Sequence, residues 1–144
     1  MLKLNKYLRE IGYSEEVFPF KKENNQYNEN EDGFVPAEFY NLDCTFDLFI
    51  YSHLCYFREN YADICTPGCF IEGYTDKDNK GHKKWLRMLD KMIFGFKVAC
   101  CPEEKMQQEL LKTNKEGLEL FYEVEKYHKK SKTLLMKYWG ILGW

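Results

Sequence analysis

Two acidic side chains stand at a spacing that acid/base chemistry can use. Asp43 and Asp47 are four residues apart, so on a helix they share one face, with Asn41 and Thr45 nearby. Paired carboxylates can act as general acid and base or hold a metal ion. The same residues also have an ordinary structural use, because Asn41 or Asp43 near a helix start can cap free backbone N–H groups while Asp47 faces water. The pattern leaves both interpretations open, and we assign no catalytic residue.

The three histidines, His53, His82 and His128, stand on three separate segments. No His-x-x-x-His motif and no pair of Glu-x-x-His motifs supports a shared metal ion. His128 is the most informative, because with Ser131 it interrupts an otherwise apolar stripe near the end of the chain. A polar side chain there can make a satisfied hydrogen bond in the core, form a polar layer that sets helix register, or contact a polar ligand in a pocket.

Six cysteines are present, and their spacing argues against a zinc site. Structural zinc usually takes two well-spaced pairs, whereas adjacent cysteines on a helix point about 100° apart. Nothing directs the chain to an oxidising compartment, so we expect most thiols to be reduced and buried, with no metal and no cofactor. The cysteines are Cys44, Cys55, Cys65, Cys69, Cys100 and Cys101.

Motifs for covalent catalysis are absent from the sequence. It contains no Gly-x-Ser-x-Gly turn, no recognisable Cys–His signature and no glycine-rich phosphate loop. An enzyme is therefore unsupported, although the sequence does not decide the point.

Aromatic and basic side chains remain as candidates for binding. An aromatic face beside guanidinium or ammonium groups suits a nucleotide, through stacking on the base and pairing with phosphate. The same residue types also concentrate in protein interfaces. The set is Tyr40, Tyr51, Tyr56, Arg58, Tyr61, Trp85, Arg87, Lys91, Tyr127, Lys130, Lys137, Tyr138 and Trp139.

The composition of the chain predicts a single domain and disfavours some classes of partner. The chain has 144 residues, of which 44% are hydrophobic and 17% aromatic, which is enough for one core, so we expect a single helical domain over 1–144. Its 21 Lys and Arg balance 23 Asp and Glu, which disfavours nucleic-acid binding. No signal peptide or membrane span is evident, so we expect a cytoplasmic protein without a membrane partner.

Periodicity predicts an all-α fold of about four helices. Apolar residues at steps of three and four mark helices near 4–11, 38–60 and 82–100. Two polar segments with glycine or proline, at 21–36 and 61–81, predict long loops.

The last predicted helix is unusually long. From Glu103 to about Trp139 there is no proline, and a near-heptad apolar stripe continues throughout. About 36 helical residues would extend roughly 54 Å, more than the diameter of a domain of this size. Either the helix bends, with Gly117 as one place for it, or another molecule covers its end, which favours a homo-oligomer.

Four segments carry a resemblance to known proteins: FYNLDCT at 39–45, WLRMLDKMIFGF at 85–96, EGLELF at 116–121 and KYWGILGW at 137–144. They resemble a recurrent family of small bacteriophage proteins of unassigned function, over about two thirds of the chain. In those proteins the Gly-Leu-x-Leu-Phe segment runs almost directly into the Lys-Tyr-aromatic end, whereas here residues 122–135 intervene. The resemblance implies phage origin and a helical fold, and it carries over no catalytic residue.

Together these observations predict a phage counter-defence protein that sequesters a nucleotide-type host immune signal without cleaving it. The residues expected to bind it are Arg58, Trp85, Arg87, His128, Tyr138 and Trp139. One alternative is a small inhibitor that binds a host protein through the long C-terminal helix, and another is a nucleotide-cleaving enzyme. This assignment is associational, because helical folds serve many functions.

Overall fold

Helices are the only regular elements in the part of the chain described by the computed structural model, which covers residues 2–18, 29–34, 42–63, 66–67 and 80–142. They are α1 (Lys6–Glu10), α3 (Leu42–Asn60), α4 (Lys80–Cys100), α5 (Glu104–Leu111), α6 (Gly117–Tyr138) and the short 3-10 helix η3 (Trp139–Ile141). The predicted all-α class is thereby confirmed. The predicted loops at 21–36 and 61–81 lie mostly outside the described residues. None of the helices described is long and apolar enough to cross a membrane.

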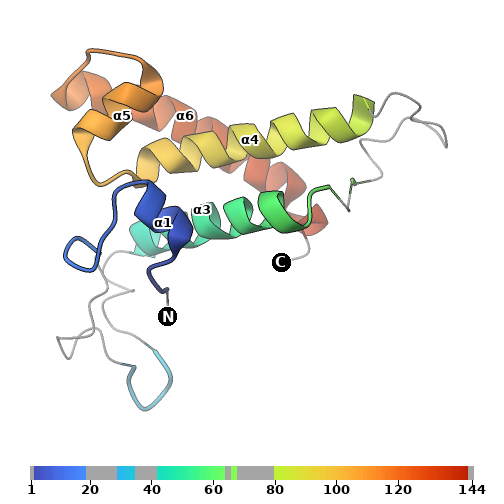
Figure 1. The fold of residues 1–144 in the computed structure, drawn as a ribbon, viewed down its shortest axis with the longest axis horizontal. Coiled ribbons are helices and arrows are strands. Elements are labelled where there is room, and N and C mark those ends of the chain that lie inside the picture. Colours follow the sequence, from blue (N-terminus) through green and yellow to red (C-terminus); the bar gives the residue numbers. More distant parts are fainter. Residues whose placement is uncertain (1, 19–28, 35–41, 64–65, 68–79, 143–144) are drawn as a thin grey trace.

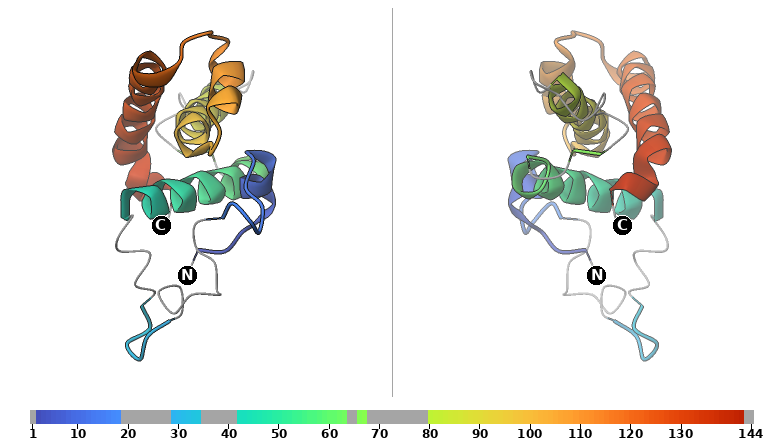
Figure 2. Two further views of the ribbon diagram at one scale, coloured as in Figure 1. Left: turned by 90° about the vertical axis from the view of Figure 1, so that its left-hand side faces the viewer. Right: turned by 90° about the vertical axis from the view of Figure 1, so that its right-hand side faces the viewer.

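Three long helices form the body of the molecule (Figure 1). α4 packs against both α3 and α6, and in Figure 2, where α4 is seen nearly end-on, α3 crosses below it and α6 lies to one side. The core between them is almost wholly closed to solvent and takes large apolar side chains from each helix. These include Tyr51 and Leu54 of α3, Trp85, Leu89, Met92 and Phe96 of α4, and Leu135 of α6.

The first helix is short, and one side chain, that of Asn5, both caps it and contacts α3. Asn5 caps α1, because its Oδ1 accepts hydrogen bonds from the backbone N–H groups of Tyr7 and Leu8. Its amide nitrogen also donates to Ser52 Oγ at 3.1 Å. One residue thus starts α1 and attaches it to α3.

The long C-terminal helix is present but begins later than the sequence predicted. α5 ends at Leu111, and α6 begins at Gly117, so residues 112–116 break what the stripe alone suggested was one helix. Lys112 has φ +52° and Gly117 has φ +55°, both in the left-handed region. Gly117 adopts this conformation readily because it has no Cβ, which places the bend where the sequence allowed one.

Side chains of α5 hold this break in place. Glu104 Oε1 accepts a hydrogen bond from the backbone N–H of Gly117 at 2.9 Å, and Gln108 Nε2 donates to the carbonyl of Lys115 at 3.1 Å. The periodic apolar stripe does not reveal these polar contacts. They satisfy backbone groups that a helix end otherwise leaves unpaired.

α4 and α6 approach each other closely at Gly95. A Cβ added there would lie 1.9 Å from Ser131 Oγ and 2.5 Å from the Tyr127 carbonyl oxygen. Ser131 Oγ donates to the Lys91 carbonyl of α4 at 3.1 Å. The small residue on one helix and the buried hydroxyl on the other therefore fix how the two helices face each other.

Candidate functional site

Two of the predicted binding residues lie in the core. Trp85 is fully buried, and Tyr138 is 9% exposed. Their rings make an edge contact with centroids 6.0 Å apart. A ligand cannot stack on Trp85 in this arrangement unless the core opens.

The other predicted residues are spread over the molecule. Arg58 of α3 forms an ion pair with Asp90 of α4, with Nε 2.9 Å from Oδ1. Arg87 is exposed on α4, and Trp139 follows the end of α6 with 36% of its surface exposed. His128 precedes Tyr138 by ten residues on α6, or about 15 Å along the axis. The structure thus brings Trp85 and Tyr138 together and leaves His128 in a separate place.

A groove between α4 and α6, which we call the lysine groove, gathers other members of the aromatic and basic set. Its volume is about 750 Å³, within the usual range for small-molecule sites. It is lined by Asp90, Lys91, Phe94, Tyr127, Lys129, Lys130, Ser131, Thr133 and Leu134.

The aromatic part of the lysine groove consists of Phe94 and Tyr127. Their rings are nearly perpendicular, with centroids 5.4 Å apart. Lys130 Nζ lies 5.8 Å from the centroid of Tyr127, a cation–π contact. Phe94 belongs to α4, whereas Tyr127 and Lys130 belong to α6, so the close α4–α6 packing at Gly95 determines how Phe94 faces the other two.

The charge of the lysine groove is positive. Lys91, Lys129 and Lys130 are exposed, and none forms an ion pair with another residue in the described ranges. The one acid of the groove, Asp90, is paired with Arg58. Three ammonium groups are therefore available to an anion.

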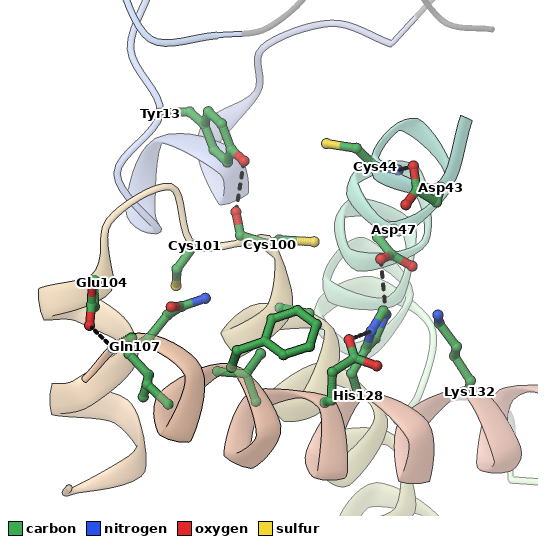
Figure 3. A pocket seen from close by; sticks show the side chains of 16 residues that line it. Tyr13, Asp43, Cys44, Asp47, Cys100, Cys101, Glu104, Gln107, His128 and Lys132 are labelled. Carbon is green, nitrogen blue, oxygen red and sulfur yellow. Dashed lines mark hydrogen bonds and ion pairs between the residues drawn. The ribbon is translucent and has the colours of Figure 1, made fainter. Parts of the chain in front are cut away.

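A second cavity, which we call the acidic pocket, lies against a different face of α6 (Figure 3). It has a volume of about 590 Å³ and is bounded by α3, the end of α4, α5 and α6. Its ionisable lining consists of Asp43, Asp47, Glu104, Glu125, His128 and Lys132, and its aromatic lining of Tyr13 and Phe121.

His128 connects α6 to α3 inside the acidic pocket. Its side chain is 6% exposed, and its Nε2 lies 2.9 Å from Asp47 Oδ2. Its Nδ1 lies 3.4 Å from Glu125 Oε1 on the same helix. The ring also makes an edge contact with Phe96, with centroids 5.5 Å apart. Asp47 thus lies against a histidine of α6 rather than facing water, as one interpretation of the sequence had it.

The thiols around the acidic pocket are poor nucleophiles. Burial raises the pKa of the Cys44 thiol, and the neighbouring Asp43 and Asp47 raise it further. Burial, followed by the charge of Asp47, raises the pKa of Cys100 well above its usual value. Because the thiolate is the reactive form, neither side chain is suited to covalent catalysis at neutral pH.

The described histidine, cysteine and acidic residues form no group of three or more that could hold a metal ion. Cys44, Cys55, Cys100 and Cys101 are free thiols, whereas Cys65 and Cys69 lie outside the described residues.

Sequence reasoning missed Phe94 and Lys129 as groove residues and Glu125 as a neighbour of His128. The candidate set from the sequence included Lys91, Tyr127 and Lys130. Which side chains lie beside them depends on how α4 crosses α6. The pair Gly95 and Ser131 was the available indication, since a glycine and a serine in facing apolar stripes are typical of close helix packing.

Comparison of the chain with protein-family models, curated proteins and solved structures gave no match. The resemblance to small phage proteins therefore stays a prediction.

Proposed function

We propose that this protein binds a small nucleotide-type anion in the lysine groove and sequesters it without cleaving it. The observation that supports this is the position of Lys91, Lys129 and Lys130 around Phe94 and Tyr127. Ammonium groups pair with phosphate oxygens, and an aromatic ring offers a surface on which a base can stack. The groove replaces the buried Trp85 and Tyr138 as the expected aromatic surface.

Sequestration follows from mass action. A ligand held unaltered by an abundant protein is withdrawn from its receptor in proportion to the tightness of binding. The resemblance to phage proteins suggests that the ligand is an immune signal of the host and that the protein acts in counter-defence. The described residues around both cavities offer no activated nucleophile, which favours binding over cleavage.

Calorimetric titration with cyclic mono-, di- and trinucleotides tests this proposal. We expect at least one to bind, with an affinity that falls as salt is raised, because the groove contacts are ionic. Lys91→Ala and Lys130→Ala should each weaken binding about tenfold, the cost of about one charge-assisted hydrogen bond. Lys126→Ala is the matched control, since Lys126 is an exposed lysine of α6 outside the groove.

Mass spectrometry of the ligand after denaturation separates binding from catalysis. Recovery of the intact nucleotide supports sequestration, whereas recovery of products would establish the nucleotide-cleaving alternative. Absence of binding by every nucleotide, or equal binding by the groove variants and the control, would contradict the proposal.

An exposed apolar surface on the first turns of α6 favours a second candidate, the inhibitor of a host protein. Leu118, Phe121 and Tyr122 are 66%, 56% and 64% exposed. Such a surface is typical of an interaction site, and self-association through it would give the predicted homo-oligomer.

We expect Leu118→Lys with Tyr122→Lys to abolish assembly while leaving nucleotide binding intact. Sedimentation velocity of this variant and of the unchanged protein measures assembly, and sedimentation with the purified host target measures inhibitor binding. A monomer in both cases, with unaltered activity in infected cells, would count against any role for this surface.

A further inference from the structure

The two ends of the lysine groove differ in chemistry. α4 and α6 run in opposite directions along it, as Figure 1 shows, so residues early in α4 lie beside residues late in α6. One end therefore holds Phe94 and Tyr127, whose rings are in contact, and we call it the aromatic end. The other end holds Asp90 and Thr133, and we call it the acceptor end. Tyr127 and Thr133 are about 9 Å apart along the axis of α6.

The acceptor end offers oxygen atoms that can only receive hydrogen bonds. Arg58 Nε donates to Asp90 Oδ1 at 2.9 Å, and within the described residues Asp90 Oδ2 receives no hydrogen bond. The Thr133 hydroxyl donates its proton to the Lys129 carbonyl at 3.0 Å, so its oxygen remains as an acceptor. The Asp90 side chain is 58% exposed, so a ligand can reach it. A ligand group at this end must therefore carry hydrogen-bond donors.

A phosphate group does not suit the acceptor end. When ionised it has only acceptor oxygens, and its negative charge repels the Asp90 carboxylate. The ammonium groups that suit a phosphate belong to Lys91 on α4 and to Lys129 and Lys130 on α6, which are attached between the two ends. The order along the groove is thus aromatic, cationic, acceptor.

This order distinguishes two classes of nucleotide. In a mononucleotide the phosphate is the last group, so with the base at the aromatic end no donor reaches the acceptor end, and a doubly charged phosphate stands near Asp90. In a dinucleotide a singly charged phosphodiester joins two nucleosides. The second nucleoside continues past the lysines and supplies hydroxyl and amine donors, and a ribose hydroxyl is a known partner of carboxylates in nucleotide sites.

We propose that the lysine groove selects a phosphodiester-linked dinucleotide over a mononucleotide, and that Asp90 and Thr133 are the residues that discriminate. One base stacks at the aromatic end, and the phosphodiester contacts the lysines. A hydroxyl or amine of the second nucleoside donates to Asp90 Oδ2 and to the Thr133 oxygen. Arg58 is a positioning residue, because it holds the Asp90 carboxylate through its other oxygen. This inference rests on the nucleotide binding proposed above and names the class of nucleotide.

Calorimetry of the full chain with cyclic di-AMP, cyclic di-GMP, AMP and GMP in about 0.15 M salt tests the selection. At neutral pH each of the four carries about two negative charges, so net charge does not separate them. We expect at least one dinucleotide to bind tenfold or more tightly than its mononucleotide. Weaker binding by the 2′-deoxy analogue of that dinucleotide assigns the donor to the ribose and unchanged binding assigns it to the base, and both results agree with the proposal.

Asp90→Asn separates a role in discrimination from a structural role. Removal of the charge should weaken dinucleotide binding several-fold and tighten mononucleotide binding several-fold, whereas damage to the groove would weaken both. Thr133→Val removes the second acceptor with little change of shape, and it should weaken only the dinucleotide. Glu119→Gln is the matched control, because it removes the same charge from an exposed acid of α6 outside the groove.

The inference is overturned by equal affinity for dinucleotides and mononucleotides, by an Asp90→Asn effect of the same sign on both, or by equal effects of Asp90→Asn and Glu119→Gln. Thr133→Val keeps the test decisive if Asp90→Asn does not fold. Lys130→Ala should weaken both classes of nucleotide. Binding that depends on Lys130 but not on Asp90 or Thr133 would overturn this inference and leave the proposed function standing, whereas no binding of any nucleotide would overturn both.

Discussion

At the scale of single residues, the two polar breaks in the stripe of α6 have different structural roles. The Ser131 hydroxyl is satisfied within the core, since it donates a hydrogen bond to the Lys91 carbonyl where α4 and α6 approach each other closely. His128 instead lines the acidic pocket, and its ring contacts the Asp47 carboxylate of α3 rather than a backbone carbonyl. The sequence identified both residues as unusual. The sequence could not distinguish their roles, because the partner of each residue lies on a helix other than α6.

The buried thiol of Cys101 predicts a loss of stability at high pH. Burial raises the pKa of Cys101 to about 11 from its ordinary value of 9.0. The thiol is charged after it loses its proton, so between pH 9 and 11 the unfolded chain ionises while the folded chain does not. Stability is therefore full below pH 9 and falls as the pH rises towards 11.

Urea unfolding at pH 8 and pH 10 under reducing conditions measures this effect. This one thiol should lower the free energy of unfolding by about 1 kcal/mol at pH 10. In Cys101→Ala the loss between the two pH values should shrink by that amount. An unchanged loss in the variant would show that the thiol does not titrate as its burial implies.

At the scale of elements, prediction was most successful for the helices with strong apolar periodicity. The helix predicted at 82–100 is observed at Lys80–Cys100, and the one predicted at 38–60 is observed at Leu42–Asn60 within the described residues. The boundary between α5 and α6 was not predictable from the stripe. It depends on hydrogen bonds from Glu104 and Gln108, which periodicity does not encode.

Gly95 determines how closely α4 and α6 pack, and Gly95→Ala should be destabilising. The added Cβ would collide with Ser131 Oγ and with the Tyr127 carbonyl, so the helices must separate. Overpacking of this kind costs about 1–3 kcal/mol, which outweighs the gain of about 1 kcal/mol in helix propensity. We expect a net loss of stability and a disturbed lysine groove.

Urea unfolding of Gly95→Ala, compared with Gly140→Ala, checks this prediction. A Cβ at Gly140 would meet nothing within 4 Å, so that variant should be nearly neutral. The double variant Gly95→Ala/Ser131→Ala should remain destabilised, because the backbone carbonyl of Tyr127 stays in place. Full recovery in the double variant would show that the serine hydroxyl alone limits the approach.

At the scale of the whole molecule, the all-α architecture and the presence of a long C-terminal helix could be predicted, whereas the candidate sites could not. The predicted binding residues were chosen by type, and type does not separate an aromatic ring of the core, such as Trp85, from one that borders a groove, such as Tyr127. That distinction follows from the relative rotation of α4 and α6. The rotation depends on Gly95 and Ser131, which carry little weight in a hydrophobicity pattern.

The two cavities on different faces of α6 have a consequence for encounters in solution. The chain has a formal net charge of only −2, so it exerts a weak overall attraction or repulsion on distant ions. Within about 8 Å of the surface, however, screening by salt is incomplete and the local field dominates. An anion that approaches Lys130 therefore meets a positive potential. A cation that approaches Asp43 meets a negative potential on the same protein. The helix α6 therefore lies between two surfaces of opposite charge.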